Sequence, residues 1–338
     1  MCQRIFLLAV FLAVCLAHSA AQDTQARAQA MLQRARELSD IRSVNASAFR
    51  LKATFSFVGK DLETAQGTYT EVWVSNSRWR RETTVNSWRR VEVGSPNRRW
   101  LLDSTVDFPD RAARVAGLLM FLPPSAATFA FESISERSNQ ETVAECTVTK
   151  HGSSGEVSAF CFDQKSGLLL QRVFPQMRPS RVVAGFRAIE HSCSYGTFQK
   201  LGNYWFPHEI LCSEDKHREI SVEVTDLSLE PTPDSALFTP PPGAIELADC
   251  PVPLKAPKAL SYAQLAESGS RDQGTVNISL VVDIKGQPQN LRVIRSAGKI
   301  LDADALNAVR RWHFQPATCN GEPAPAEITV EIGFWGPQ

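Results

Sequence analysis

The sequence predicts an α+β protein in which a long antiparallel sheet with one apolar helix precedes a small module ordered strand, strand, helix, strand. Two observations carry this prediction. Runs of alternating apolar and polar residues, separated by turn signals at short intervals, fill residues 49–229 as antiparallel strands would. After a proline-rich segment the alternation resumes, and one stretch of helical periodicity interrupts it near the end of the chain.

The first 21 residues are typical of a secretory signal peptide, because Arg4 precedes an apolar run over Ile5–Leu16 and small residues follow it up to Ala21. We expect cleavage after Ala21 and export to the periplasm. An uncleaved anchor is disfavoured because the apolar run is shorter than the roughly 20 residues of a membrane-spanning helix. Lipidation at Cys15 is a further alternative, but Val14 stands where a lipidation motif usually has Gly, Ala or Ser.

Residues 22–42 are expected to form an amphipathic helix, and a β domain is expected over residues 43–245. The helix has an apolar face, which comprises Ala28, Met31, Leu32, Ala35 and Leu38. The strands are expected at seven runs, which are LKATFSFV, GTYTEVWV, WRRVEV, RRWLLD, SAFCF, LLLQRVF and EISVEVTDL.

One helix is expected to interrupt these strands, over Asp110–Leu122. Its second half is apolar nearly all round, so it must be buried rather than docked on a surface. An apolar cavity or groove lined by this helix would involve Val115, Leu118, Leu119 and Leu122. The alternative is an ordinary core that the helix fills.

Tryptophan and arginine alternate at three places in the β domain, which are 78–81, 88–90 and 98–100. Such a pattern could make a platform for nucleic acid. Around Trp79 it is also typical of a half-buried strand with Trp inside and Arg outside. We favour the structural interpretation, because the chain has 36 basic and 36 acidic residues and an exported protein rarely meets nucleic acid. Binding of anionic lipid head groups is the surviving functional alternative.

Six cysteines remain after the signal peptide, and an even number in a secreted chain favours disulfides. Two pairs flank turn signals and could face each other across hairpins, namely Cys146 with Cys161 and Cys193 with Cys212. Cys250 and Cys319 are then left for each other. The alternative is that the cysteines are free buried thiols. No CxxC motif is present, so neither a zinc site nor redox catalysis is expected.

Three segments of the β domain resemble the half-barrel of LolA-type lipoprotein carriers. They are DQKSGLLLQRV (163–173), YGTFQKLGNYWFPHEI (195–210) and LFTPPPGA (237–244). This resemblance implies an antiparallel β half-barrel with a concave apolar surface that could hold an acyl chain.

A proline-rich linker is expected over residues 246–260, and a second domain over residues 261–338. One face of a strand that ends at the turn Lys285-Gly286 holds Val276, Ile278, Leu280, Val282 and Ile284, and the outward face holds Asn277, Ser279, Val281 and Asp283. Leu291–Arg295 forms its partner. Asp302 is then expected to cap a helix, with Asp304 in its first turn and Arg310 and Arg311 in its last. Its apolar face holds Leu301, Ala305, Ala308, Val309 and Trp312, and Pro316 prevents its continuation. A last strand follows, with Ile328, Val330, Ile332 and Phe334 inward and Glu327, Thr329 and Glu331 outward. Its two glutamates could alternatively blunt an exposed edge against aggregation.

This order of elements closely resembles the C-terminal domain of the TonB energy-transducer family, through VVDIKGQPQNLRVIRSAG (281–298), LDADALNAVRRWHFQPAT (301–318) and NGEPAPAEITVEIGF (320–334). In that family the domain binds outer-membrane transporters by adding a transporter strand beside its last strand. The resemblance assigns this role here to Ala326, Glu327, Ile328, Thr329, Val330, Glu331, Ile332, Gly333 and Phe334. The chain departs from the family in having a folded β domain and a short linker where a transducer has a membrane helix and a long spacer, which puts force transmission in doubt.

Neither catalysis nor a cofactor is expected. His151, His191, His208, His217 and His313 are scattered, and the segment after His208 lacks the second histidine of a zincin. The GSSG stretch does not meet the G-x-S-x-G pattern of a nucleophile elbow. We therefore predict a non-enzymatic envelope adaptor of the TonB family, related to TonB-dependent transport, that engages an outer-membrane partner by strand addition. The alternative is a periplasmic carrier of lipid or lipoprotein, and a second copy of the chain could also occupy the edge of the last strand.

Overall fold

The structure is a computed structural model that describes residues 22–58, 64–104, 112–138, 143–151, 156–179, 186–250, 254–261 and 273–334. The predicted signal peptide, including Cys15, lies outside the described residues. Among the described residues, strands predominate and helices are few, so the predicted α+β class fits broadly. None of the helices in these residues is both long enough and apolar enough to cross a membrane.

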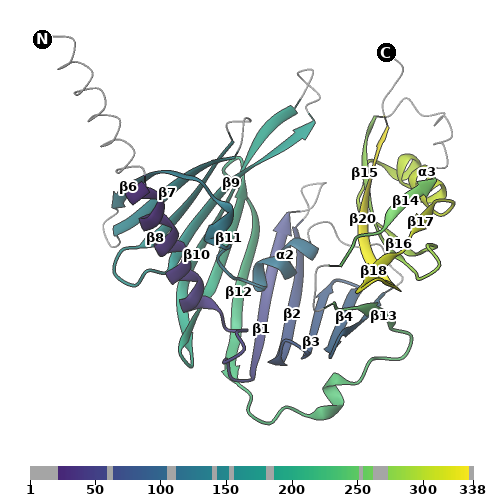
Figure 1. Ribbon diagram of the computed structural model, residues 1–338, viewed down its shortest axis with the longest axis horizontal. Coiled ribbons are helices and arrows are strands. Elements are labelled where there is room, and N and C mark those ends of the chain that lie inside the picture. Colours follow the sequence, from purple (N-terminus) through teal and green to yellow (C-terminus); the bar gives the residue numbers. More distant parts are fainter. Residues whose placement is uncertain are drawn as a thin grey trace, which may run out of the picture. The chain divides into compact units, whose positions relative to one another are not determined.

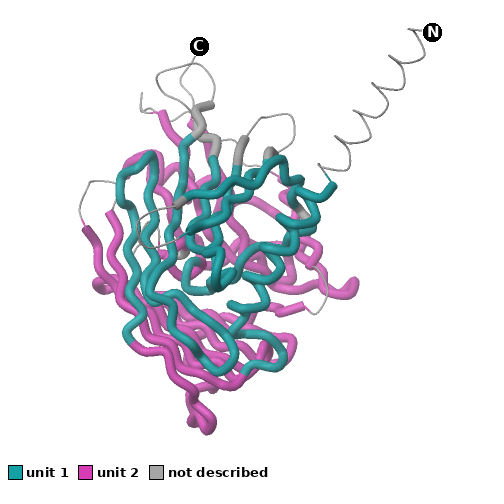
Figure 2. The backbone as a smooth tube through the Cα atoms, turned by 90° about the vertical axis from the view of Figure 1, so that its left-hand side faces the viewer, with its two compact units in different colours: residues 1–46, 118–225 teal, residues 47–117, 226–338 magenta. Residues whose placement is uncertain are grey.

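The chain divides into two compact units, each built from two stretches of sequence (Figure 2). Unit 1 comprises residues 1–46 and 118–225, and unit 2 comprises residues 47–117 and 226–338. The C-terminal module thus belongs to the same unit as the first strands of the β domain. The predicted domain boundaries, which follow the sequence, stay a prediction.

In unit 1, an N-terminal helix over residues 22–39 accompanies an antiparallel sheet (Figure 1). The sheet order is β12-β11-β10-β9-β8-β7-β6. The strands are β6 (Phe131–Ser138), β7 (Val143–His151), β8 (Glu156–Asp163), β9 (Leu169–Pro179), β10 (Phe186–Leu201), β11 (Tyr204–Glu214) and β12 (His217–Leu229), of which the last four residues belong to unit 2. The helix buries Ala28, Leu32 and Ala35, as its predicted apolar face requires. A short 3-10 helix, η1 (Ala126–Thr128), precedes β6.

In unit 2, the first antiparallel sheet has the order β13-β5-β4-β3-β2-β1. Its strands are β1 (Phe49–Val58), β2 (Thr64–Ser75), β3 (Arg78–Val85), β4 (Trp88–Ser95), β5 (Arg98–Asp103) and β13 (Ile245–Ala248). A 3-10 helix, η3 (Ser235–Phe238), lies before β13 in the sequence. The helix α2 (Ala112–Leu119) is shorter than predicted and contains the sequence boundary between the units.

The C-terminal module has a three-stranded antiparallel sheet in the order β16-β15-β20, with α3 packed on one face (Figure 1). Its elements are β14 (Lys258–Ser261), β15 (Gly274–Val282), β16 (Pro288–Arg295), α3 (Lys299–Val309), β17 (His313–Gln315), β18 (Ala317–Cys319), β19 (Glu322–Ala324) and β20 (Ala326–Phe334). The short strands pair as β14 with β17 and β18 with β19. They were not predicted, and β13 and β14 overlap the beginning and the end of the stretch that was expected to be a linker.

The three predicted disulfides are confirmed. Cys146 pairs with Cys161 across β7 and β8, and Cys193 pairs with Cys212 across β10 and β11. Each pair lies directly opposite in the strand register, so each disulfide staples a hairpin. Cys250 pairs with Cys319, which closes a loop of 69 residues around most of the C-terminal module.

Several predicted details of the module are wrong. Ile284 does not continue the buried face of β15 but is 55% exposed, because the strand ends at Val282 and Asp283 caps a turn through the backbone N–H groups of Lys285 and Gln287. The helix α3 is capped not by Asp302 but by Gly298, four residues earlier, whose φ of 122° an L side chain rarely adopts, and Asp304 lies beyond the first turn.

Asp302 therefore lies in the first turn of α3, where its carboxylate accepts hydrogen bonds from the Ser296 hydroxyl and the Ala297 N–H. At the other end, Arg310 is the residue that caps the helix, so neither it nor Arg311 lies in the last turn. The negative charge near the N-terminus still suits the helix dipole.

Candidate functional site

The predicted partner-binding strand has the bounds that the sequence predicted, Ala326–Phe334. It pairs with β15 along its whole length, from Ala326 opposite Val282 to Phe334 opposite Gly274. In the described part of the chain β15 is its only strand neighbour, so β20 is an edge of the sheet. An edge strand leaves a row of backbone N–H and C=O groups on its outer side, which is a template for another strand.

One face of β20 belongs to the core of the module. Ile332 and Phe334 are buried against Val276, Ile278 and Leu280 of β15, and Ile328 and Val330 pack at the margin of the same cluster. The buried face of α3 completes this cluster with Leu301, Ala305 and Val309, and Trp312, three residues after the end of the helix, packs against the same cluster rather than on the helix as predicted. The predicted core role of Trp312, which is 8% exposed, is therefore confirmed. The core holds β20 in register with β15 independently of anything on its other edge.

The opposite face of this sheet is partly covered as well. Val281 of β15 is only 2% exposed, because it packs against Leu101 of β5 and Leu247 of β13. The sequence predicted Val281 on the outward face. Next to this contact, the N–H of Ala248 donates to the carbonyl oxygen of Pro325, at 3.2 Å, just before β20 begins. The start of β20 is therefore attached to the first sheet of unit 2, whereas its later part is not.

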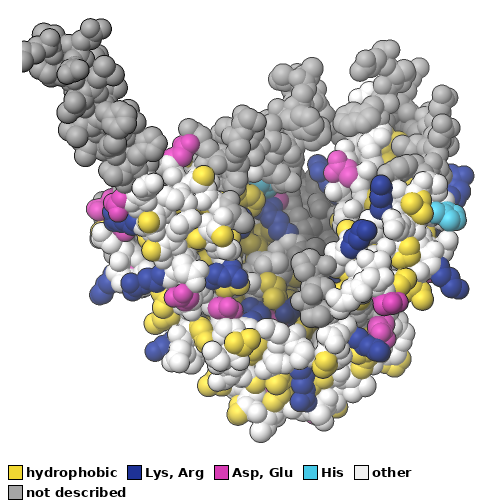
Figure 3. Space-filling model, viewed as in Figure 1, with side chains coloured by type: hydrophobic (Ala, Val, Ile, Leu, Met, Phe, Trp, Pro, Cys, Tyr) yellow, Lys and Arg dark blue, Asp and Glu magenta, His cyan; other side chains and the backbone are white. Residues whose placement is uncertain are grey.

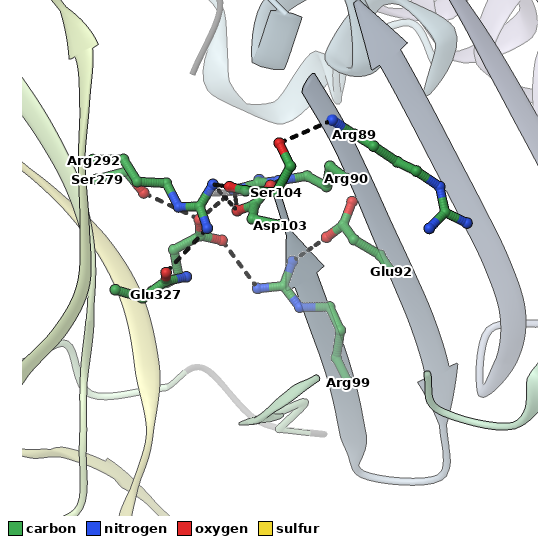
Figure 4. A network of polar contacts seen from close by, with 10 residues as sticks. Arg89, Arg90, Glu92, Arg99, Asp103, Ser104, Ser279, Arg292 and Glu327 are labelled. Atoms are coloured by element: carbon green, nitrogen blue, oxygen red, sulfur yellow. Dashed lines mark hydrogen bonds and ion pairs between the residues drawn. The ribbon is translucent and has the colours of Figure 1, made fainter. Parts of the chain in front are cut away.

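A network of three arginines and three carboxylates surrounds this contact (Figure 4). It comprises Arg90, Glu92, Arg99, Asp103, Arg292 and Glu327, and we call it the arginine–carboxylate network. At its centre, Arg90 donates two hydrogen bonds to Asp103, from Nε to Oδ1 at 2.9 Å and from Nη2 to Oδ2 at 2.7 Å. Arg292 of β16 lies 3.5 Å from the same carboxylate and donates to the backbone oxygen of Ser104 at 2.7 Å.

Glu327 connects β20 to this network. Its Oε1 accepts hydrogen bonds from Arg90, at 3.0 Å, and from the hydroxyl of Ser279, at 3.1 Å. Its Oε2 lies 3.6 Å from Arg99, which also donates to Glu92 at 2.9 Å. The sequence predicted Glu327 on the outward face, which is correct, and weighed it as a charge that blunts the edge. The structure instead gives it two arginine partners.

The centre of the network is buried, and this burial contributes to shifts in the pKa values of two of its arginines. The side chain of Asp103 has no exposed area, and those of Arg90 and Arg292 are 14% and 12% exposed. Burial acts to lower the pKa of Arg90, but the hydrogen bonds to Asp103 and the nearby carboxylates outweigh it and raise the pKa above its ordinary value. Burial, and secondarily the charge of Arg90, lowers the pKa of Arg292. Because buried charges are stable only when paired, the network favours close contact between β16, β20 and the first sheet.

The tryptophan and arginine pattern fits the structural interpretation at Trp79 and Trp88, whereas Trp100 is half-buried. Trp79 and Trp88 are 6% and 2% exposed, so both tryptophans belong to the core. Arg81 lies over the Trp79 ring, 4.0 Å from its centroid, and donates to Glu71 at 2.9 Å. Figure 3 shows dark blue and magenta side chains interspersed on the face in view, as expected for a chain without net charge.

The predicted cavity residues are buried to different degrees. Val115 and Leu119 have no exposed area, whereas Leu118 and Leu122 are half-buried. The cavity itself stays a prediction. Just after α2, the Phe121 ring contacts three aromatic rings of unit 1, with centroid distances between 4.7 and 6.4 Å. These rings belong to Tyr195, Phe198 and Phe206.

Sequence reasoning missed the residues that reach across long separations. Asp103 and Glu327 lie more than two hundred positions apart, and no local pattern indicates that Arg90 bonds both. Of the histidines, His208 is half-buried and His217 and His313 are exposed, whereas His191 lies beside two glutamates. The proximity of His191 and Glu214 could have been predicted from the disulfide, because the register that pairs Cys193 with Cys212 places His191 opposite Glu214.

Comparison with known proteins identifies the C-terminal module. Residues 258–335 match the family model described as Gram-negative bacterial TonB protein C-terminal. Two curated relatives, both named Protein TonB and from two strains of Xanthomonas campestris pv. campestris, are 35% identical over 63 residues. The match covers 18% of this chain and spans 28% of the length of each relative. The resemblance of these residues to the TonB C-terminal domain is therefore confirmed.

Solved structures similar to the chain include two that each cover somewhat less than two thirds of it. One is a candidate outer membrane lipoprotein-sorting protein domain from Vibrio parahaemolyticus, with 9% identity and a TM-score of 0.39 over 64% of this chain and 97% of that chain. The other is a LolA superfamily protein from Nitrosomonas europaea, with 12% identity and a TM-score of 0.39 over 62% of this chain and 96% of that chain.

Proposed function

We propose that this chain is a non-enzymatic adaptor of the Gram-negative cell envelope, exported to the periplasm, whose C-terminal module binds an outer-membrane partner by strand addition along β20. The observation that carries the proposal is the sheet order β16-β15-β20, which leaves β20 at an edge among the described residues. The match of residues 258–335 to the TonB C-terminal model supports the same interpretation. A relation to TonB-dependent transport belongs to this proposal.

The later part of β20 is the segment suited to receive a strand. Thr329 and Glu331 are exposed, and their side chains alternate with apolar ones that face the core. The beginning of the strand is engaged by Ala248 and by the arginines that bind Glu327. An incoming extended segment would therefore bond to the backbone of residues 329–334, with main-chain hydrogen bonds giving affinity and its own alternate side chains giving specificity.

Site-specific cross-linking in the full chain tests this proposal. A photoreactive amino acid at Thr329 or Glu331 should cross-link the same envelope protein, and one at the exposed Asn307 of α3 should not, because α3 covers the other face of the sheet. Thr329→Pro, which removes a main-chain donor and stiffens the strand, should abolish this product, while Glu331→Gln should change it little. A folded Thr329→Pro chain that still gives the product at position 331 would rule out docking by β20.

A second copy of the chain is the competing occupant of the edge. Homodimer formation through β20 would give a cross-link between identical chains and a doubled mass in light scattering. Thr329→Pro should then return the mass to that of a monomer. A cross-link between a monomeric chain and a different envelope protein favours the adaptor function. A cross-link between two copies of the chain, with no other product, contradicts that function.

A carrier of lipid or lipoprotein is the second candidate function, favoured by the apolar character of α2 and by the aromatic cluster around Phe121. Such rings could contact an acyl chain as readily as each other. A fluorescent fatty acid titrated into the full chain tests this candidate. Leu118→Asp should weaken its binding, and Leu229→Asp, at a residue that is already 51% exposed, is the control. Absence of binding by the folded wild-type chain leaves only an ordinary core.

A further inference from the structure

One histidine and two glutamates lie together on the sheet of unit 1, although they come from three strands. His191 belongs to β10, Glu214 ends β11 and Glu219 lies near the start of β12. The imidazole and the two carboxylates each offer a ligand atom, and these three atoms lie within 4.8 Å of one another. His191 is 1% exposed, Glu219 is 4% exposed and Glu214 is half-buried. We call these residues the His–Glu cluster.

The strand register explains how Glu214 reaches His191. The two residues are directly opposite in the β10–β11 ladder, two positions from the pair Cys193–Cys212. Side chains two positions apart point to the same face of a sheet. The disulfide therefore joins the two strands beside the two ligands and on the same face.

Glu219 joins them because β12 contains a β-bulge. Cys212 pairs with Ile220 and the next residue, Ser213, pairs with Arg218, so Glu219 is an extra residue without a counterpart on β11. In a regular strand, Glu219 and Ile220 would point to opposite faces. Here both are buried, so the bulge turns the glutamate toward the buried face.

The residue types suit a divalent cation. Carboxylate oxygen and imidazole nitrogen are ligands that divalent transition metals accept, and two ionised carboxylates would balance the charge of such an ion. The Phe174 ring stacks on His191 with a centroid distance of 5.3 Å, and Arg172 lies over the same Phe174 ring, 4.8 Å from its centroid.

We propose that His191, Glu214 and Glu219 bind one divalent transition-metal ion, with zinc as the ion that fits this ligand set best. Zinc accepts imidazole nitrogen and carboxylate oxygen at about 2.0–2.2 Å, and three protein ligands leave a fourth position open. In a tetrahedral site such ligands lie about 3.3 Å apart, a value that follows from those bond lengths. The glutamate side chains would close the remaining distance by rotation when the ion binds.

Titration of the full, untagged chain with Co²⁺, after treatment with a chelator, tests the proposal. The wild-type chain should take up one equivalent of Co²⁺ with visible ligand-field absorption, and Zn²⁺ should displace it. His191→Gln, Glu214→Gln and Glu219→Gln should each weaken binding about 100-fold or more, because losing even an outer partner of a metal ligand costs 10–100-fold. His208→Gln and Glu209→Gln, on the same β11 strand but outside the cluster, are matched controls and should bind like the wild type.

Circular dichroism reports whether each variant folds. If one variant does not fold, the other two carry the comparison, since each removes a different ligand. The wild-type chain alone can overturn the proposal, by taking up no stoichiometric Co²⁺. Wild-type Co²⁺ affinity in all three variants would overturn it as well, because the ion would then be bound elsewhere.

Discussion

Replacing Asp103 by Asn tests whether the arginine–carboxylate network stabilises unit 2. The substitution keeps the size of the side chain and one acceptor oxygen, but removes the negative charge between two buried arginines. It also turns an amide NH2 group toward a guanidinium. Removing one partner of a buried ion pair typically costs about 3–5 kcal/mol, because the remaining charge is left uncompensated. Glu327 still neutralises part of the charge of Arg90, so we expect the lower end, about 3 kcal/mol.

Urea unfolding followed by tryptophan fluorescence measures this loss, since Trp88 and Trp100 lie on the strands that carry Arg90 and Asp103. With a slope of about 2–3 kcal/mol per molar urea, the midpoint should fall by about 1 M or more. Glu246→Gln is the matched control on neighbouring β13. It breaks the ion pair between Glu246 and Arg98, whose side chains are 49% and 60% exposed respectively, and should cost at most about 0.5 kcal/mol.

Salt distinguishes the two substitutions further. The small effect of Glu246→Gln should vanish in 0.5 M NaCl, which screens exposed charges, whereas that of Asp103→Asn should persist. If Asp103→Asn lowered the midpoint no more than Glu246→Gln, the network would not stabilise unit 2 and the reasoning from burial would be refuted.

Three further outcomes are expected. Burial raises the pKa of Tyr195 to about 12, although the charge of Arg172 acts to lower it. Tyrosine in the unfolded chain ionises near pH 10. The contribution of Tyr195 to the free energy of unfolding is therefore fully present below pH 10 and falls by about 2–3 kcal/mol toward pH 12. Urea midpoints between pH 9 and 11.5 should decline less in Tyr195→Phe, and an unchanged decline contradicts this assignment. Trp312→Ala should cost about 3–5 kcal/mol, while Ile300→Ala, at a residue of α3 that is 57% exposed, should cost under about 0.5 kcal/mol. Similar thermal midpoints would deny Trp312 its core role. Both Gly286 and Gly243 have φ near 80°, but only at Gly286 would a Cβ collide with a backbone oxygen. Gly286→Ala should therefore destabilise the chain by about 2 kcal/mol or more, and Gly243→Ala by about 1 kcal/mol. Equal urea midpoints for the two variants would contradict the collision.

The alternation of apolar side chains was enough to predict the strands where a single register fits. β20 has its predicted bounds because four apolar residues alternate without interruption from Ile328 to Phe334. The same pattern failed at Ile284, because alternation continues in the sequence for one residue after Asp283 has turned the chain. Periodicity alone does not show where backbone hydrogen bonding ends.

Features that depend on irregular backbone or on distant residues could not be predicted. The start of α3 depends on the left-handed conformation of Gly298, which a sequence with Asp302 nearby does not indicate. Val281 has an apolar side chain on the outward face of its strand, and only contact with Leu101 and Leu247 shows why. The bulge that turns Glu219 inward shifts its periodicity by one residue, so the buried glutamate looks like an exposed one in the sequence.

The disulfide Cys250–Cys319 has a mechanical consequence for any partner that pulls on β20. A pulling force that enters at β20 travels back along the chain to Cys319 and then crosses the covalent bridge to Cys250, two residues after β13. The stretch between the two cysteines, which contains β15, β16 and α3, lies outside this load path. Traction could therefore peel β20 from β15 while tension passes directly into the first sheet, and the bypassed helix and strands would carry no load along their backbone.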